Sequence, residues 1–193
     1  MASLAAGQPT GRWTTLRPVH TSDASLLYEL FLDPRVGATW RYGGAHPDPE
    51  EFRATLWDGV LAHFLIMGRE RGEVVGYVAA RGADFRNGHV HLAAAVGGNW
   101  IDAGWPIEGV ILFMGFLFNN WPFRRIYLES VDYVADRYGS LAGRYMTCEG
   151  RLVEHLFREG EYRDLLVFSL TRSNYGRMAE KFLPAIKASS SNG

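Results

Sequence analysis

Residues 90–131 decide the fold of this chain. They read, in order, VHLAAAV, GGNWIDAGWP, IEGVILFMGFLFNN, WPFR and RIYLESV. The first and last pieces are apolar enough for buried strands, the second is a glycine-rich turn, and the third repeats apolar residues at helical spacing. Pro106 suits the first position of a helix, where its missing N–H group costs nothing. The stretch therefore predicts a strand, a turn, a helix over about 107–120 and a second strand.

The turn of residues 97–106 leads directly into the start of the predicted helix. Free N–H groups and the positive end of the helix dipole favour an anion at such a place, and pyrophosphates bind there in many proteins. The alternative is an ordinary strand-turn-helix crossover without a ligand. A lone glycine-rich turn does not separate these two interpretations.

Length and composition indicate one globular domain. The chain has 193 residues, 47% of them hydrophobic and 13% aromatic, which is enough to bury a sizeable core. We expect a flexible arm over residues 1–11, a single domain over 12–187 and a disordered tail over 188–193. The net charge of −1 argues against a nucleic-acid partner held by bulk charge.

The single cysteine, Cys148, excludes an internal disulfide and fits a cytoplasmic protein; we interpret it as a buried, inert thiol. Residues 1–11 lack the basic start and apolar core of a signal peptide. We find no apolar run of bilayer-spanning length, so we expect no membrane partner. The six histidines lack metal-ligand spacing, and we predict no metal site.

The other elements follow from the same patterns. Asn87-Gly88 predicts a hairpin. Residues 35–47 form a loop that either lines a pocket or connects elements at the surface. We expect helices over 21–32, 48–62, 132–143 and 174–186, and strands over 13–19, 63–69, 74–81, 90–96, 125–131, 152–157 and 162–170.

This order predicts a mixed α/β domain with a mostly antiparallel sheet flanked by helices. Three antiparallel strands precede a crossover helix and a parallel strand. The strands 90–96 and 125–131 should part at their carboxyl ends and open a wedge, where ligands of α/β sheets tend to bind.

Four strings of the chain carry a family resemblance. They are 16–19 (LRPV) with Asp23, 75–78 (VGYV), 86–88 (RNG) and 148–164 (CEGRLVEHLFREGEYRD). Over roughly Thr15 to Tyr175, the chain resembles the GNAT superfamily of acyl-CoA N-acyltransferases. It is most similar to the branch that includes the ribosomal-protein N-terminal acetyltransferases.

The resemblance implies the GNAT fold, acetyl-CoA as the cofactor, and transfer of an acyl group, in the first place acetyl, to an amine. The acceptor would be a small molecule or a peptide N-terminus. The resemblance also implies a homodimer, since the last strands of this family often pair between subunits.

The family's phosphate loop reads Gln/Arg-x-x-Gly-x-Gly/Ala, and residues 101–106 align with it as IDAGWP. Gly104 is kept. Ile101 replaces the basic or amide residue, Pro106 has no N–H group to offer, and Asp102 adds a negative charge. No lysine or arginine lies in the turn or in the helix that follows.

The family usually carries an asparagine and a tyrosine after the strand 125–131, and the tyrosine protonates the leaving thiolate. Counting back from residues 149–152 places Val134 and Leu141 there, with Tyr138 and Tyr145 about one helical turn away.

On these grounds we select candidate site residues in three groups. A base on the strand 90–96 would take a proton from the attacking amine, and a histidine there is a competent base near neutral pH. The catalytic candidates are His91, His89, Tyr138 and Glu129. The cofactor-binding candidates are Val96, Gly97, Gly104, Trp105, Ile107, Glu108 and Gly109. The substrate-pocket candidates are Trp40, Tyr42 and Trp100.

Each candidate has a plainer interpretation. The histidines would face water at a hairpin edge. Glu108 would stabilise the helix dipole from the first turn, and Glu129 would be solvated. The aromatic side chains would belong to the core rather than to a pocket.

Three hypotheses for the function follow. The first is an acyl-CoA-dependent N-acyltransferase. The second is an enzyme of the same fold that has lost coenzyme A and modifies a natural-product-like intermediate. The third is a non-catalytic binding module, because fold does not determine function. Free N–H groups at residues 107–109 together with a tyrosine hydroxyl would favour the first, whereas Trp100 or Trp105 filling the groove would favour the other two.

Overall fold

The computed structural model describes residues 8–33, 36, 45–100, 103–135, 143–158 and 160–183. The strands of these residues form a seven-stranded sheet in the order β1-β2-β3-β4-β5-β7-β6. The strands are β1 (Thr14–Pro18), β2 (Val60–Gly68), β3 (Val74–Asp84), β4 (His89–Val96), β5 (Arg125–Val131), β6 (Thr147–Arg158) and β7 (Glu161–Thr171). The helices are η1 (Thr21–Asp23), α1 (Ala24–Leu32), α3 (Pro49–Ala54), η2 (Gly98–Trp100), α4 (Ile107–Asn120), α5 (Asp132–Ala135) and α7 (Arg172–Phe182).

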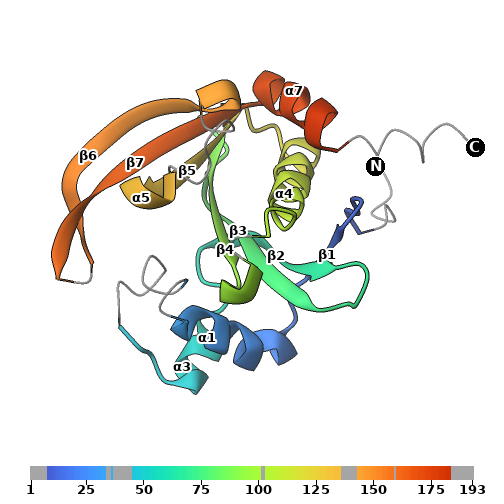
Figure 1. The fold of residues 1–193 in the computed structure, drawn as a ribbon, viewed down its shortest axis with the longest axis vertical. Coiled ribbons are helices and arrows are strands. Elements are labelled where there is room, and N and C mark those ends of the chain that lie inside the picture. The colour runs from blue at the N-terminus through green and yellow to red at the C-terminus, as the bar shows by residue number, and fades with distance from the viewer. Residues whose placement is uncertain are drawn as a thin grey trace, which may run out of the picture.

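The sheet is mixed and mostly antiparallel, as predicted. β1 to β4 pair antiparallel in sequence order, β5 joins β4 in parallel, and β7 and β6 continue antiparallel from β5. α4 forms the crossover between the two parallel strands. Figure 1 shows β6 and β7 extending as a long curved hairpin away from the rest of the molecule.

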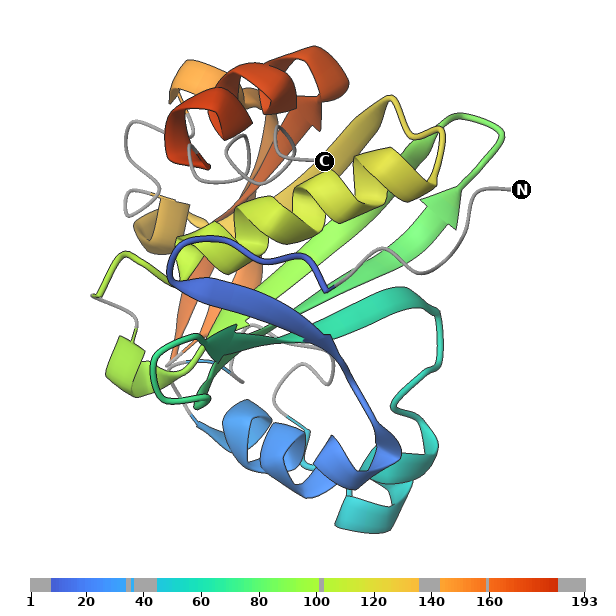
Figure 2. The same cartoon turned by 90° about the vertical axis from the view of Figure 1, so that its right-hand side faces the viewer.

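Helices cover the two faces of the sheet in separate places. Figures 1 and 2 show α4 and α7 over one face and α1 with α3 over the other. Each layer has its own hydrophobic core: the larger cluster lies between the sheet and α4, and the smaller one between the sheet and α1 with α3. Along β4 the side chains alternate, so Val90 and Leu92 belong to the first cluster and Ala95 to the second.

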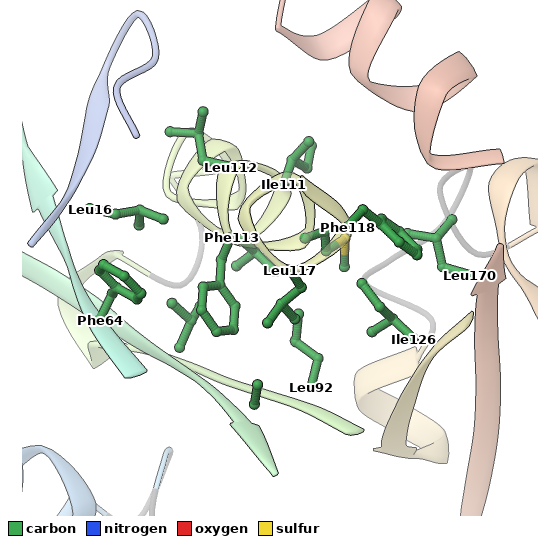
Figure 3. Close-up of a cluster of buried hydrophobic side chains, with 14 of the residues drawn as sticks. Leu16, Phe64, Leu92, Ile111, Leu112, Phe113, Leu117, Phe118, Ile126 and Leu170 are labelled. Carbon is green, nitrogen blue, oxygen red and sulfur yellow. The ribbon is translucent and has the colours of Figure 1, made fainter. Parts of the chain in front are cut away.

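α4 is buried on almost every side, more than a one-faced amphipathic helix would be. Besides the predicted apolar stripe, Leu112 and Phe113 are also buried. Figure 3 shows the labelled side chains of α4 pointing both toward the sheet and toward Leu170 of β7. Two glycines permit this close packing. A Cβ at Gly109 would lie 2.4 Å from Cγ2 of Ile66, and one at Gly115 would lie 2.1 Å from the hydroxyl of Tyr175.

Several predicted elements agree closely with the structure. β5 spans the predicted residues 125–131, and the turn of 85–88 joins β3 to β4 as the Asn-Gly signal indicates. Asp48 caps α3, since its Oδ1 accepts the N–H groups of Glu50 and Glu51.

Two predictions are wrong. The helix predicted over 48–62 ends at Ala54, because Gly59 adopts a φ of 65° and Val60 already pairs with Arg81 of β3. Cys148, predicted to be buried, is exposed on β6.

Some predictions lie outside the described residues. They include most of the loop 35–47, the greater part of the helix 132–143 and the tail 188–193. Within the part of the chain that the structure describes, no helix is long and apolar enough to cross a membrane.

Candidate functional site

β4 and β5 part at their carboxyl ends and open the predicted wedge. Their parallel pairing runs from His89–Arg125 to Leu92–Leu128 and then stops. β4 nevertheless continues to Val96, paired with β3 on its other side. Among the described residues, positions 93–96 of β4 therefore have no partner strand on the β5 side.

The backbone of β4 presents polar groups to this wedge. The N–H of Gly97 donates to the carbonyl of Val75 on β3 at 2.9 Å. Hydrogen-bonding direction alternates along an antiparallel ladder, so the polar groups of Ala94 and Val96 point away from β3 and into the wedge. Of the two cofactor-binding candidates at the end of β4, Val96 directs its N–H away from β3, whereas the N–H of Gly97 is bonded to β3.

His91 and Glu129 lie next to the point where the strands separate. His91 Nδ1 is 3.8 Å from Glu129 Oε1, across the β4–β5 pair. Both side chains are about half exposed, at 44% and 52%. Even a charged pair as exposed as this one would contribute at most about 1 kcal/mol to stability, so we do not expect the contact to stabilise the fold appreciably.

Tyr127 connects the two candidate histidines. Its ring centroid is 5.4 Å from that of His89 and 5.5 Å from that of His91. Tyr127 is not among the residues predicted from sequence. Its place beside His91 follows from the register of the β4–β5 pair, which the sequence pattern does not fix.

His89 is anchored on the side away from the wedge. Its Nε2 lies 3.6 Å from Oδ2 of Asp84. The N–H and the side-chain amide of Asn87 donate to the same carboxylate, and these bonds hold the pKa of Asp84 below its ordinary value. Nδ1 of His89 is buried without a hydrogen-bond partner among the described residues.

Glu108, on the first turn of α4, is bound within the chain. Its carboxylate accepts the N–H groups of Arg12, Trp13 and Thr14 and the hydroxyl of Thr14, at 2.8 to 2.9 Å. It is 4% exposed. Figure 2 shows the segment before β1 lying across the start of α4. A Cβ at Gly11 would lie 2.4 Å from Cδ of Glu108, so a larger residue there would have to displace this carboxylate.

The amides at the start of α4 are not free, contrary to the expectation from sequence. Ile107, Glu108 and Gly109 donate to the carbonyls of Gly104, Trp105 and Pro106. Gly104 itself is exposed with a φ of 73°, and a Cβ there would touch nothing within 4 Å.

Trp100 and Trp105 pack on each other and on the main core. Their ring centroids are 5.4 Å apart in an edge-to-face arrangement. Both rings are partly buried against the cluster beneath α4. The structure thus gives Trp100 a packing role at the junction of β4 and α4, in line with the plainer interpretation of this aromatic side chain.

Several candidates lie outside the described residues: Trp40, Tyr42, Tyr138, Ile101 and Asp102. Tyr145, an alternative to Tyr138, is only 5% exposed and packs against Phe182 in the core. The described residues contain no cluster of three or more metal-ligating side chains. A shallow hollow of about 650 Å³ near Arg124 and Arg172 lies by the start of β5, at the opposite end of that strand from the wedge.

The residues present fit one part of coenzyme A better than another. The free edge of β4 can pair with an extended arm that carries amides, and the alanines at 93–95 leave room for it. The start of α4 offers a nucleotide diphosphate neither free amides at 107–109 nor a basic side chain, and it carries the Glu108 carboxylate.

Comparison with known proteins identifies the fold. No family model matches the chain, and no curated protein matches it in sequence. Solved structures do match. Spermidine N-acetyltransferase from Vibrio cholerae, in complex with CoA and spermine, superposes with a TM-score of 0.73 at 16% identity, over 84% of this chain and 98% of that one. An acetyltransferase of the GNAT family from Bacillus anthracis gives 0.67 at 14% identity, over 85% and 98%.

The chain has the GNAT fold. At these identities the likeness concerns the fold alone. The finer resemblance, to the ribosomal-protein N-terminal acetyltransferase branch, stays a prediction.

Proposed function

We propose that this GNAT-fold chain is an N-acyltransferase, which transfers an acyl group from a thioester of the coenzyme A type to an amine. The amine belongs to a small molecule or to a peptide N-terminus. One observation carries the proposal: β4 and β5 separate after Leu92 and Leu128, with His91 and Glu129 beside the opening.

Each residue at the opening has a distinct task in this proposal. His91 accepts the proton that the amine loses as it attacks, and Glu129 steadies the imidazolium that results. The N–H of Val96 donates to the extended arm of the donor and so helps to position its thioester. When bound, the donor supplies a thioester carbonyl to this point. His89 and Tyr127 hold the imidazole of His91 in place by ring packing.

The first test is the melting temperature of the protein with and without millimolar acetyl-CoA. A ligand present at about 100 times its Kd stabilises the folded state by about 2.7 kcal/mol, which shifts the transition clearly. Release of free thiol upon addition of a panel of amines then reports the transfer itself. A thioester that neither binds nor reacts would contradict the proposal.

A second candidate function has its own support. The bound Glu108 carboxylate, the engaged amides and the Trp100–Trp105 pair favour a GNAT-fold enzyme that no longer uses acetyl-CoA. Such an enzyme would show no thermal shift with acetyl-CoA and would bind a different ligand in the wedge. The homodimer implied by the resemblance stays a prediction.

A further inference from the structure

At the N-terminus of α4, a carboxylate of the chain itself already occupies the place where the helix dipole favours an anion. Four donors of the segment Arg12–Thr14 bind the Glu108 carboxylate, which is almost fully buried. A helix N-terminus attracts an anion through its dipole and its unpaired N–H groups. Here the chain supplies the anion itself, and a diphosphate at the same place would meet a fixed negative charge.

In the described part of the loop, most of the usual donors for a diphosphate are already bonded. The amides of residues 107–109 are bonded inside the turn, and Pro106 has none. Two arginines on adjoining segments already make contacts within the chain. The guanidinium of Arg12 lies 4.9 Å from the ring centroid of Trp13, and Arg69 donates to the carbonyls of Gly11 and Arg12.

The wedge, in contrast, is suited to the pantetheine arm of an acyl-CoA. A pantetheine arm is extended and carries two amides, so it can pair with the free edge of β4 as an added strand would. Ala94 and Val96 present their backbone groups on that edge. The arm ends in the thioester, and an arm that runs along β4 from Val96 toward Leu92 would carry the thioester to His91.

We infer that this chain recognises its acyl donor through the pantetheine arm and not through the nucleotide diphosphate. The inference rests on the proposed function and narrows its donor to any acyl thioester that presents this arm. Such thioesters include acyl-CoA and the phosphopantetheine of an acyl carrier protein. In the reaction, the C–N bond forms and the C–S bond breaks. The sulfur leaves with the bonding electrons and takes up a proton, while the proton lost by the amine goes to His91.

The test compares donors of increasing size on the full chain. Calorimetric titration gives the Kd of pantetheine, phosphopantetheine and coenzyme A, and thiol release gives kcat/KM for the acetyl thioesters of pantetheine and coenzyme A. We expect the Kd values, and likewise the two kcat/KM values, to agree within about threefold, because the added nucleotide contributes little. Coenzyme A binding about thirtyfold more tightly than pantetheine would overturn the inference.

The outcomes separate the inference from the proposed function. If acetyl-CoA reacts and acetyl-pantetheine does not, the transferase function stands and the inference is wrong. If no thioester binds or reacts, both are wrong. A third donor, the acetylated carrier protein, separates the two sources of the arm: a kcat/KM about tenfold above that of acetyl-CoA assigns the donor to a carrier, and an equal value assigns it to free thioesters.

One variant tests the diphosphate directly. Arg12 is exposed, and only its backbone N–H binds Glu108, so Arg12→Ala keeps the hydrogen bonds between residues 12–14 and Glu108. We expect its Kd for coenzyme A to stay within about twofold of the wild-type value. A tenfold loss of affinity for coenzyme A, with the pantetheine affinity unchanged, would show that this arginine holds the diphosphate and would overturn the inference.

Discussion

The carboxylate of Glu108 and the hydroxyl of Thr14 lie 2.9 Å apart, although 94 residues separate them in the chain. The N–H of Thr14 donates to the same oxygen at 2.8 Å. This contact joins the first strand of the sheet to the first turn of the crossover helix. It also places a negative charge where proteins with helix-start anion sites receive a phosphate.

Removing this contact should destabilise the fold. Glu108→Ala leaves buried donors of the 12–14 segment without an acceptor, and we expect a loss of about 2–4 kcal/mol in the free energy of unfolding. Urea denaturation measures it as a lower midpoint with an unchanged slope. Glu29→Ala removes an exposed carboxylate from α1 and should change the free energy by less than about 0.5 kcal/mol. Equal effects of the two variants would contradict the claim that the hydrogen bonds of Glu108 stabilise the fold.

His91 should matter for rate and hardly at all for stability. If it is the base, His91→Ala lowers kcat by about 10²–10⁴-fold while KM changes little. The melting temperature should stay close to that of the wild type, because the side chain is 44% exposed. His155→Ala, on the exposed β6 strand, is the matched control and should retain full activity. A normal kcat in the His91 variant would remove it from the mechanism.

The free edge of β4 can be tested with proline. Val96→Pro removes an N–H that faces the wedge and leaves the ladder to β3 intact. We expect coenzyme A and pantetheine to lose affinity by the same factor, about tenfold or more, in calorimetric titration. Val96→Ala keeps the N–H and should bind both ligands within about twofold of the wild type. A proline variant that binds normally would show that the arm lies elsewhere.

Arg17 and Asp23 should make stability depend on pH. Both guanidinium NH groups of Arg17 donate to the Asp23 carboxylate, at 3.0 and 2.8 Å. This bonding, with the N–H of His20, lowers the pKa of Asp23 below its ordinary value. The folded state therefore binds a proton less readily than the unfolded chain, so the stabilisation is present above about pH 4 and is lost as the pH falls through the folded pKa.

A double-mutant cycle of Arg17→Met and Asp23→Asn isolates this pair. We expect a coupling of about 0.2–1 kcal/mol at pH 7 that decreases toward zero in acid, as Asp23 becomes protonated. A coupling that remains constant over this range would mean that packing, and not the charge of Asp23, joins the two residues.

Elements with a strong local signal could be predicted from sequence. The apolar run of β5, the period of α4 and the Asp-Pro start of α3 each depend on residues close together in the chain. The end of α3 could not be predicted in this way. Residues 60–62 are compatible with a helix, but pairing with β3 makes them a strand. Tertiary pairing overrides a weak local preference at such places.

In the candidate site, too, some features could be predicted from sequence and others depended on the tertiary structure. The family resemblance pointed to His91, and the order of the predicted elements pointed to Glu129 and a wedge between two parallel strands. Which amides remain free in that wedge depends on how β3 and β4 are paired, and this pairing separates Val96 from Gly97. Tyr127 joins the histidines only because the parallel register brings it beside them.

The sequence by itself determined the mixed sheet and the crossover helix, because hydrophobic periodicity and turn residues act over short stretches of chain. The GNAT fold was implied by the resemblance of four strings of the chain to that superfamily. Only the tertiary structure decided the state of the anion site at α4. The partners of Glu108 lie more than ninety residues away, and no local pattern reveals that a distant backbone segment has already occupied the helix start.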